Sequence, residues 1–242
     1  MNINLILPFL SSIIMIAFAA DVFRRYALKP THTHLLVWGI GLTMFAIGSV
    51  AEAISAFVWN PIVFFCWYLF GAALNAGWIG QGTVYLLFRR KWVTVLTAIL
   101  IVGSLVAGYL MVSIMPRLDS SQFTPSKSLS DQYRFIMPEG AAVRLTTPFF
   151  NIYGLITLVG GAIYSAYLFW RKRILPNRVI GNVLIAAGAL SIGLASTLTR
   201  LGIGAFLYLG ELIAAVMMYA GFVLASQPAA VEENSSASQP AD

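Results

Sequence analysis

Long apolar runs separated by short polar segments recur along the chain as far as residue 226. A helix that crosses the hydrocarbon core of a bilayer needs about 20 mostly apolar residues, and each run reaches roughly that length. The pattern predicts an all-α membrane protein, with a seven-transmembrane helix bundle in residues 1–226. The expected helices are Ile3–Phe23, Leu35–Phe57, Ile62–Phe88, Val93–Met115, Phe149–Trp170, Val179–Thr199 and Ala205–Ser226.

Two longer polar segments interrupt or end this pattern. Residues 116–148 join the fourth and fifth helices and form the one long connection, expected on the outer side. Its apolar residues Tyr133, Phe135, Ile136 and Met137 predict partial folding over the helix ends. Residues 227–242 turn to Ala, Ser, Pro and Glu, a composition typical of a disordered tail, here expected in the cytoplasm.

The basic residues are divided unequally between alternate connections. Of the 15 lysines and arginines, ten lie in the connections that follow the first, third and fifth helices. Because Lys and Arg are retained on the cytoplasmic side, the N-terminus is expected outside and the C-terminus inside. The formal net charge of +6 is then a topology signal and an attraction to anionic membrane lipid. No nucleic-acid partner is expected.

Lysine, histidine and cysteine positions exclude several cofactors. A retinal pigment needs a lysine in its last helix, but none of the four lysines lies in any of the seven expected helices. His32 and His34 lie at one membrane interface, so they cannot be paired ligands of a transmembrane haem. No carboxylate or cysteine accompanies them, and Cys66 is the only cysteine, so no metal site is expected.

Three ionisable residues near the outer ends of helices are the main candidates for a ligand site. At a rise of 1.5 Å per residue, Glu211 lies roughly 10 Å below the outer surface, too deep for its side chain to reach water. An ionisable group at such depth indicates a functional site with a nearby partner. The expected partners are Glu52, near the outer end of the second helix, and Arg200, at the outer end of the sixth. The alternative is that Arg200 anchors a helix end and Glu211 fixes packing.

Further polar residues suggest a central third helix and an extension of the same pocket. Ala72, Ala76 and Gly80 recur every four residues in this helix, a strip against which another backbone can pack closely. The amides of Asn75 and Gln81 should face inward, because an amide in hydrocarbon needs a partner. Further candidate ligand-binding residues are Tyr68 and Asn75 in this helix and Asn151 at the start of the fifth.

The residues that carry a family resemblance fall in three stretches, 67–87 (WYLFGAALNAGWIGQGTVYLL), 144–173 (RLTTPFFNIYGLITLVGGAIYSAYLFWRKR) and 198–222 (LTRLGIGAFLYLGELIAAVMMYAGF). They resemble a family of bacterial seven-transmembrane proteins described as hypothetical membrane proteins. The resemblance implies a bacterial cytoplasmic membrane, adds weight to Asn151, Arg200 and Glu211, and implies no activity. A looser likeness to the seven-helix sensory modules that precede histidine kinases implies signalling through a separate partner protein.

These observations favour a protein that binds a small or lipidic ligand from the outer side, as a sensor or carrier. One alternative is a noncatalytic partner or assembly subunit, whose small-residue helix faces pack against another membrane protein. A second is a membrane enzyme that acts on lipid, with Glu52 or Glu211 as general base. It is the weakest, because the helices offer no histidine and no nucleophile beside a base. No catalytic residue is assigned.

Overall fold

The computed structural model describes residues 3–88, 91–125, 127–172, 176–200 and 207–227. Within these residues it contains seven helices long and apolar enough to cross a membrane, and no strand. The predicted all-α class with seven membrane-spanning helices is therefore confirmed. The predicted disordered tail lies outside the described residues, apart from Gln227.

The seven crossings are of two kinds, unbroken helices and helices that contain a π-helical segment. The unbroken ones are α1 (Ile3–Leu28), α2 (Thr33–Ser55), α5 (Lys91–Ile114, continued by the 3-10 turn η2, Met115–Arg117), α9 (Pro176–Arg200) and α10 (Leu207–Ala225). The third crossing consists of α3 (Pro61–Cys66), the π-helix η1 (Trp67–Leu74) and α4 (Asn75–Leu87). The fifth consists of α7 (Val143–Gly154), the π-helix η4 (Leu155–Val159) and α8 (Gly160–Arg171).

The fifth crossing begins earlier than its apolar run predicts. It starts at Val143 rather than at Phe149, so residues 143–148 are helical and do not belong to the loop. Pro148 lies inside this helix. At this sixth position of the helix, proline removes one intrahelical hydrogen bond, the one to the carbonyl oxygen of Arg144.

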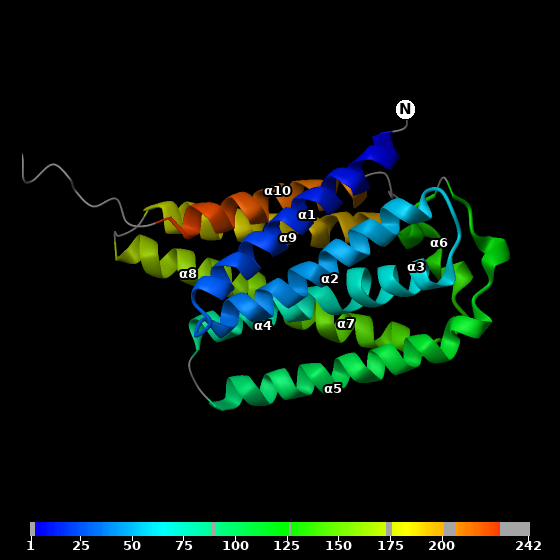
Figure 1. The fold of residues 1–242 in the computed structure, drawn as a ribbon, viewed down its shortest axis with the longest axis horizontal. Coiled ribbons are helices and arrows are strands. Elements are labelled where there is room, and N and C mark those ends of the chain that lie inside the picture. Colours follow the sequence, from blue (N-terminus) through cyan, green and yellow to red (C-terminus); the bar gives the residue numbers. More distant parts are fainter. Residues whose placement is uncertain (1–2, 89–90, 126, 173–175, 201–206, 228–242) are drawn as a thin grey trace, which may run out of the picture.

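Six crossings form a closed series of neighbours, and the fourth lies outside it. α1 lies beside α2 and α10, α9 lies beside α10 and α8, and α4 contacts α2 and α7. Figure 1 shows α5 along one edge of the bundle, away from α1, α9 and α10. Its apolar side chains are largely exposed, with Ile99 at 62% and Leu105 at 69%, which is typical of a helix that faces lipid.

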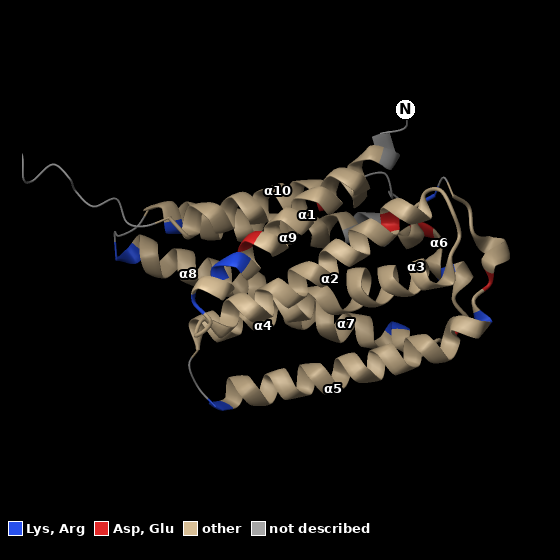
Figure 2. Ribbon diagram, in the orientation of Figure 1, with Lys and Arg blue, Asp and Glu red and all other residues tan. Residues whose placement is uncertain are grey.

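Charged residues gather toward the two ends of the bundle and leave its middle uncharged (Figure 2). We call the end that carries residues 116–142 the loop end, and there Glu52 and Asp131 lie. We call the opposite end, which carries Arg25 and Arg178, the basic end.

The third crossing, predicted to be central from its small and polar residues, is one member of this closed series and packs against the second, fourth and fifth crossings. Gly48 of α2 and Gly71 of η1 bring two backbones so close that a Cβ on Gly48 would lie 2.3 Å from the Cα of Gly71. On α4, a Cβ on Gly80 would lie 3.0 Å from the Cα of Gly154. Close backbone approach is the usual role of small residues between membrane helices. The small-residue strip of this crossing therefore packs against its own chain.

A hydrogen-bonded network joins three crossings around Gln81, whose side chain is fully buried. Its Nε2 donates to the carbonyl oxygen of Val93 at 3.0 Å and to Oγ1 of Thr97 at 2.8 Å, both on α5. Its Oε1 accepts a hydrogen bond from the hydroxyl of Tyr153 on α7. Every polar atom of this amide is thus engaged, as an amide in hydrocarbon requires.

Replacing Gln81 with leucine should lower the free energy of unfolding by about 1 to 2 kcal/mol, because the Tyr153 hydroxyl loses its acceptor. SDS-induced unfolding in mixed micelles, followed by circular dichroism, measures this change. Gln122→Leu, at an exposed position of the loop, is the matched control and should change the free energy by less than about 0.5 kcal/mol. Equal effects of both substitutions would contradict a stabilising network.

The loop between the fourth and fifth crossings folds onto the helix ends, as predicted. It forms the short 3-10 helix η3 (Ser120–Gln122) and the helix α6 (Leu129–Ile136). Leu129, Ile136 and Met137 are buried, whereas Phe135, predicted to join them, is 68% exposed. The helical repeat of about 3.6 residues per turn explains this correction. Leu129 and Ile136 are seven residues apart and share the buried face of α6, whereas Phe135 points away from that face.

The start of η3 is fixed by the carboxylate of Asp119. Its Oδ1 accepts hydrogen bonds from the backbone N–H of Ser121 at 3.0 Å and from the Ser121 hydroxyl at 2.6 Å. These bonds favour the ionised carboxylate and lower the pKa of Asp119 below its usual value. The turn therefore keeps its cap in mildly acidic solution.

Candidate functional site at the loop end

Glu52 is the centre of a polar cluster at the loop end. It lies near the end of α2 and is only 3% exposed. Its Oε1 accepts hydrogen bonds from the hydroxyl of Tyr208 at 2.7 Å and from the backbone N–H of Leu129 at 3.0 Å. One carboxylate oxygen thus ties α2 to α10 and to the loop helix α6. The other oxygen, Oε2, is buried and has no hydrogen-bond partner among the described residues.

The local sequence explains why α6 begins at this carboxylate. Ser128 is the N-cap, and its hydroxyl accepts a hydrogen bond from the backbone N–H of Asp131 at 3.2 Å. The N–H of Leu129, at the first helical position, has no acceptor within the helix, as at every helix N-terminus. Glu52 supplies that acceptor, and its negative charge is favourable at the positive end of the helix dipole. The buried carboxylate therefore holds the loop helix onto the bundle.

Glu211 faces the same cluster from α10. It lies three residues after Tyr208, a spacing that places both side chains on one face of the helix. Its carboxylate is close enough to that of Glu52 for their charges to interact. Oε2 of Glu211 is also buried and unpartnered among the described residues. The structure thus brings together the two carboxylates that the sequence singled out.

Among the described residues, no positively charged side chain forms an ion pair with these carboxylates. The predicted third member, Arg200, ends α9, and its side chain lies outside the described part of the structure. In the described part, the ion pairs are those of Asp21 with two arginines at the basic end, far from Glu52 and Glu211. Asp131 on α6 adds a further negative charge that acts on Glu52. Such a cluster attracts a positively charged group, because like charges repel strongly where water is excluded.

Two predicted site residues, Asn75 and Asn151, satisfy the backbone of η1 instead. Nδ2 of Asn75 donates to the carbonyl oxygen of Gly71 at 2.8 Å. Nδ2 of Asn151 donates across the helix interface to the carbonyl oxygen of Ala72 at 3.2 Å. A π-helical segment disturbs the regular hydrogen bonds of an α-helix, and inside a membrane freed carbonyls need other donors. In this structure both amides therefore stabilise the helix rather than line the cluster.

Tyr68, the remaining predicted residue, supports the loop helix. It is buried, and its hydroxyl lies 3.1 Å from Oγ1 of Thr147 on α7. Its ring packs against that of Tyr133 on α6, with 6.0 Å between the ring centroids. Tyr68 thus contacts α6, the helix whose N-terminus rests on Glu52.

Sequence reasoning missed two members of the cluster, Tyr208 and Leu129. Tyr208 had a usable signal, because its spacing from Glu211 places both on one helix face. Leu129 takes part through its backbone N–H. The pattern of side chains in a sequence does not predict which helix N-terminus will contact a carboxylate far away in the chain.

The fold and the cluster define a class of protein, a membrane-spanning seven-helix bundle with a buried carboxylate cluster beneath a folded loop. Comparisons of the chain with protein-family models, with curated proteins and with solved structures found no match.

Proposed function

We propose that the protein is a sensor or carrier that binds a small cation, or the cationic group of a lipid, at the Glu52, Tyr208 and Glu211 cluster. We further propose that it lies in a bacterial cytoplasmic membrane, with the loop end and the N-terminus outside and the C-terminus inside. The distribution of basic residues and the resemblance to a bacterial seven-transmembrane family support this placement.

Two carboxylate oxygens that have no partner in the described part of the chain, Oε2 of Glu52 and Oε2 of Glu211, carry the proposal. Buried polar atoms in proteins are normally hydrogen-bonded, so two orphaned acceptors in one cluster need an explanation. A cation or a protonated amine would satisfy both and offset their mutual repulsion. The Tyr208 hydroxyl already bonds Oε1 of Glu52 and leaves these oxygens available.

The loop helix controls access to this cluster. Glu52 and Leu129 are 3% and 1% exposed, so a ligand from the loop end reaches the carboxylates only when α6 moves. Lids of this kind admit a ligand and then exclude water from the site. Both a sensor and a carrier can use such a step.

The packing of small residues bears on the assembly-subunit alternative. The small-residue strip on the third crossing packs against the fifth crossing. On α9, a Cβ on Gly181 would lie 2.5 Å from the carbonyl oxygen of Gly221 on α10. These faces are therefore occupied within the chain, which favours the ligand-binding proposal.

Native mass spectrometry of the gently solubilised protein tests the proposal. We expect the wild type and Glu139→Gln, an exposed loop control, to retain a small cationic molecule. Glu211→Gln keeps the size of the side chain but removes its charge, and should reduce the retained fraction at least about tenfold. A stoichiometric partner chain in every sample, with no small molecule in any, would overturn the proposal in favour of an assembly subunit.

Reconstituted vesicles separate the two forms of the proposal. A carrier should accumulate the retained molecule, and Glu211→Gln should abolish that uptake. A sensor should bind without accumulation and change the hydrogen exchange of residues 129–136. Binding that alters neither uptake nor exchange would contradict both forms.

A further inference from the structure

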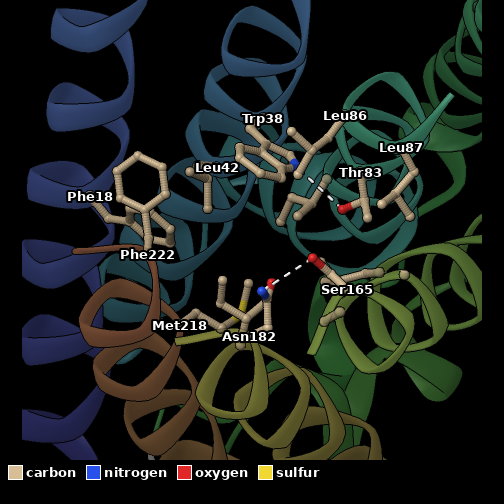
Figure 3. A pocket seen from close by; sticks show the side chains of 15 residues that line it. Phe18, Trp38, Leu42, Thr83, Leu86, Leu87, Ser165, Asn182, Met218 and Phe222 are labelled. Carbon is tan, nitrogen blue, oxygen red and sulfur yellow. Dashed lines mark hydrogen bonds between the residues drawn. The ribbon is translucent and has the colours of Figure 1, made fainter. Parts of the chain in front are cut away.

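A cavity lies toward the opposite end of the bundle from the carboxylate cluster. It opens within the closed series of crossings, between α1, α2, α4, α8, α9 and α10. Trp38 lies near the start of α2, Asn182 near the start of α9 and Phe222 near the end of α10, which places the cavity toward the basic end. Figure 3 shows these side chains around one central space.

The cavity is narrow and mostly apolar. Its volume is about 40 Å³, and Phe18, Leu42 and Met218 are among the side chains that line it. An apolar cavity of about 150 Å³ holds benzene, so this smaller space has no room for a ring and could take only the end of an alkyl chain. Leu86 lines the cavity and is 42% exposed, so the lining reaches the surface of the bundle at this residue.

The polar groups of the lining are concentrated in two pairs (Figure 3). Nε1 of Trp38 donates to Oγ1 of Thr83 at 3.2 Å, and Nδ2 of Asn182 donates to Oγ of Ser165 at 3.2 Å. Both pairs are satisfied internally. They therefore do not require a polar ligand inside the cavity, and the apolar remainder decides what enters it.

Beyond the Asn182 pair, toward the basic end, lies an arginine with an unused donor. Arg178 precedes Asn182 by one helical turn, and its backbone carbonyl accepts a hydrogen bond from Nδ2 of Asn182 at 2.8 Å. Its guanidinium stacks over the ring of Phe169, 5.4 Å from the centroid. Nε of Arg178 is buried and has no hydrogen-bond partner among the described residues. A buried guanidinium nitrogen without an acceptor is costly, and an anionic oxygen would satisfy it.

A second arginine lies at the same end of the cavity. The guanidinium of Arg25 lies 4.7 Å from the centroid of the Phe222 ring, and Phe222 lines the cavity. Arg25 is paired with Asp21 at 3.2 Å, so its charge is partly offset. The rim is consequently positive, with Arg178 as its unpaired member in the described part of the chain.

From this arrangement we infer a second binding site, for one alkyl chain of an anionic amphiphile. Its alkyl end occupies the cavity beside Trp38, and its carboxylate or phosphate lies at Arg178. The size of the cavity selects one chain, and the basic rim selects the sign of the headgroup. This site is independent of the carboxylate cluster, which attracts the opposite charge at the opposite end of the bundle.

Quenching of tryptophan fluorescence by 12-bromododecanoic acid tests the inference, with the full-length protein in phosphatidylcholine nanodiscs. The bromine at the chain end should enter the cavity and quench Trp38, a saturable component that the Trp38→Phe protein lacks. Ala162→Leu fills the cavity, because Ala162 is a buried lining residue, and should weaken this component at least about tenfold.

Arg178→Gln tests the headgroup without changing the cavity. It should weaken binding of the bromo acid about tenfold. Arg24→Gln is the matched control, because the Arg24 side chain is 75% exposed, and it should bind as the wild type does. Saturable quenching of equal affinity in the wild type and in both Ala162→Leu and Arg178→Gln would overturn the inference.

Competition identifies the class and the source of the ligand. Dodecanoate and dodecyl phosphate should displace the bromo acid, and dodecyltrimethylammonium should not. If the natural occupant is one chain of an anionic phospholipid, nanodiscs that contain phosphatidylglycerol should suppress the quenching. If the natural occupant is a free fatty acid, these nanodiscs should leave the quenching unchanged. Equal displacement by the trimethylammonium compound would contradict recognition of a negative headgroup.

Discussion

Replacing Glu52 with alanine is expected to detach the loop helix α6 from the bundle. The substitution removes the common acceptor of the Tyr208 hydroxyl and the Leu129 N–H, and leaves two buried donors unpaired. Each unpaired donor costs about 1 to 3 kcal/mol, so the free energy of unfolding should fall by about 2 to 6 kcal/mol. Hydrogen exchange should locate the change, because residues 129–136 lose protection before the transmembrane helices do.

Glu52→Gln is the matched variant that separates the two roles of this carboxylate. The amide oxygen still accepts the hydrogen bonds that hold α6, so protection of residues 129–136 should stay close to that of the wild type. The charge is lost, however, and retention of a cationic ligand should fall as it does for Glu211→Gln. Loss of α6 protection in Glu52→Gln as large as in Glu52→Ala would show that charge, rather than the acceptor, holds the helix.

Adding one methyl group at Gly48 should separate the second and third crossings. The new Cβ would lie 2.3 Å from the Cα and 2.9 Å from the backbone nitrogen of Gly71, and neither atom belongs to a flexible side chain. The helices must therefore move apart. Overpacking usually costs about 1 to 3 kcal/mol, and a backbone contact places Gly48→Ala at or above the upper end. SDS unfolding in mixed micelles measures the loss.

Gly160→Ala is the control for the effect of alanine itself. Nothing lies within 4 Å of the position that its Cβ would occupy. Alanine has the higher helix propensity, so this variant should be unchanged or more stable by up to about 1 kcal/mol. If both glycine variants unfolded alike, close approach of Gly48 and Gly71 would not limit the packing.

The carboxylate cluster and the cavity at the basic end share two helices. Glu52 and Trp38 lie on α2, and Glu211 and Phe222 lie on α10. Variants at one site should therefore be tested for binding at the other. The Glu211→Gln protein is expected to bind 12-bromododecanoic acid with wild-type affinity, because its substitution changes no lining residue of the cavity.

The sequence alone determined the architecture, because a bilayer imposes a local rule on each crossing. About 20 apolar residues form a helix there whatever the remainder of the chain does, since backbone groups in hydrocarbon must bond within the segment. Single positions likewise gave the prediction that the protein binds neither retinal nor haem. The local pattern also singled out Glu52 and Glu211, because a carboxylate inside an apolar run is conspicuous without any knowledge of its neighbours.

Only the tertiary structure decided what those carboxylates meet. The hydrogen bonds of Glu52 to Leu129 and to Tyr208 join residues 77 and 156 positions apart. Likewise, the sequence suggested Asn75 and Asn151 as site residues, but in the structure they donate hydrogen bonds to carbonyl oxygens of a π-helical segment. The apolar pattern of the sequence does not predict that segment. Hydrophobic periodicity specifies which segments are buried. Which polar groups become partners depends on helix packing and loop folding, and these follow from close contacts between distant residues such as Gly48 and Gly71.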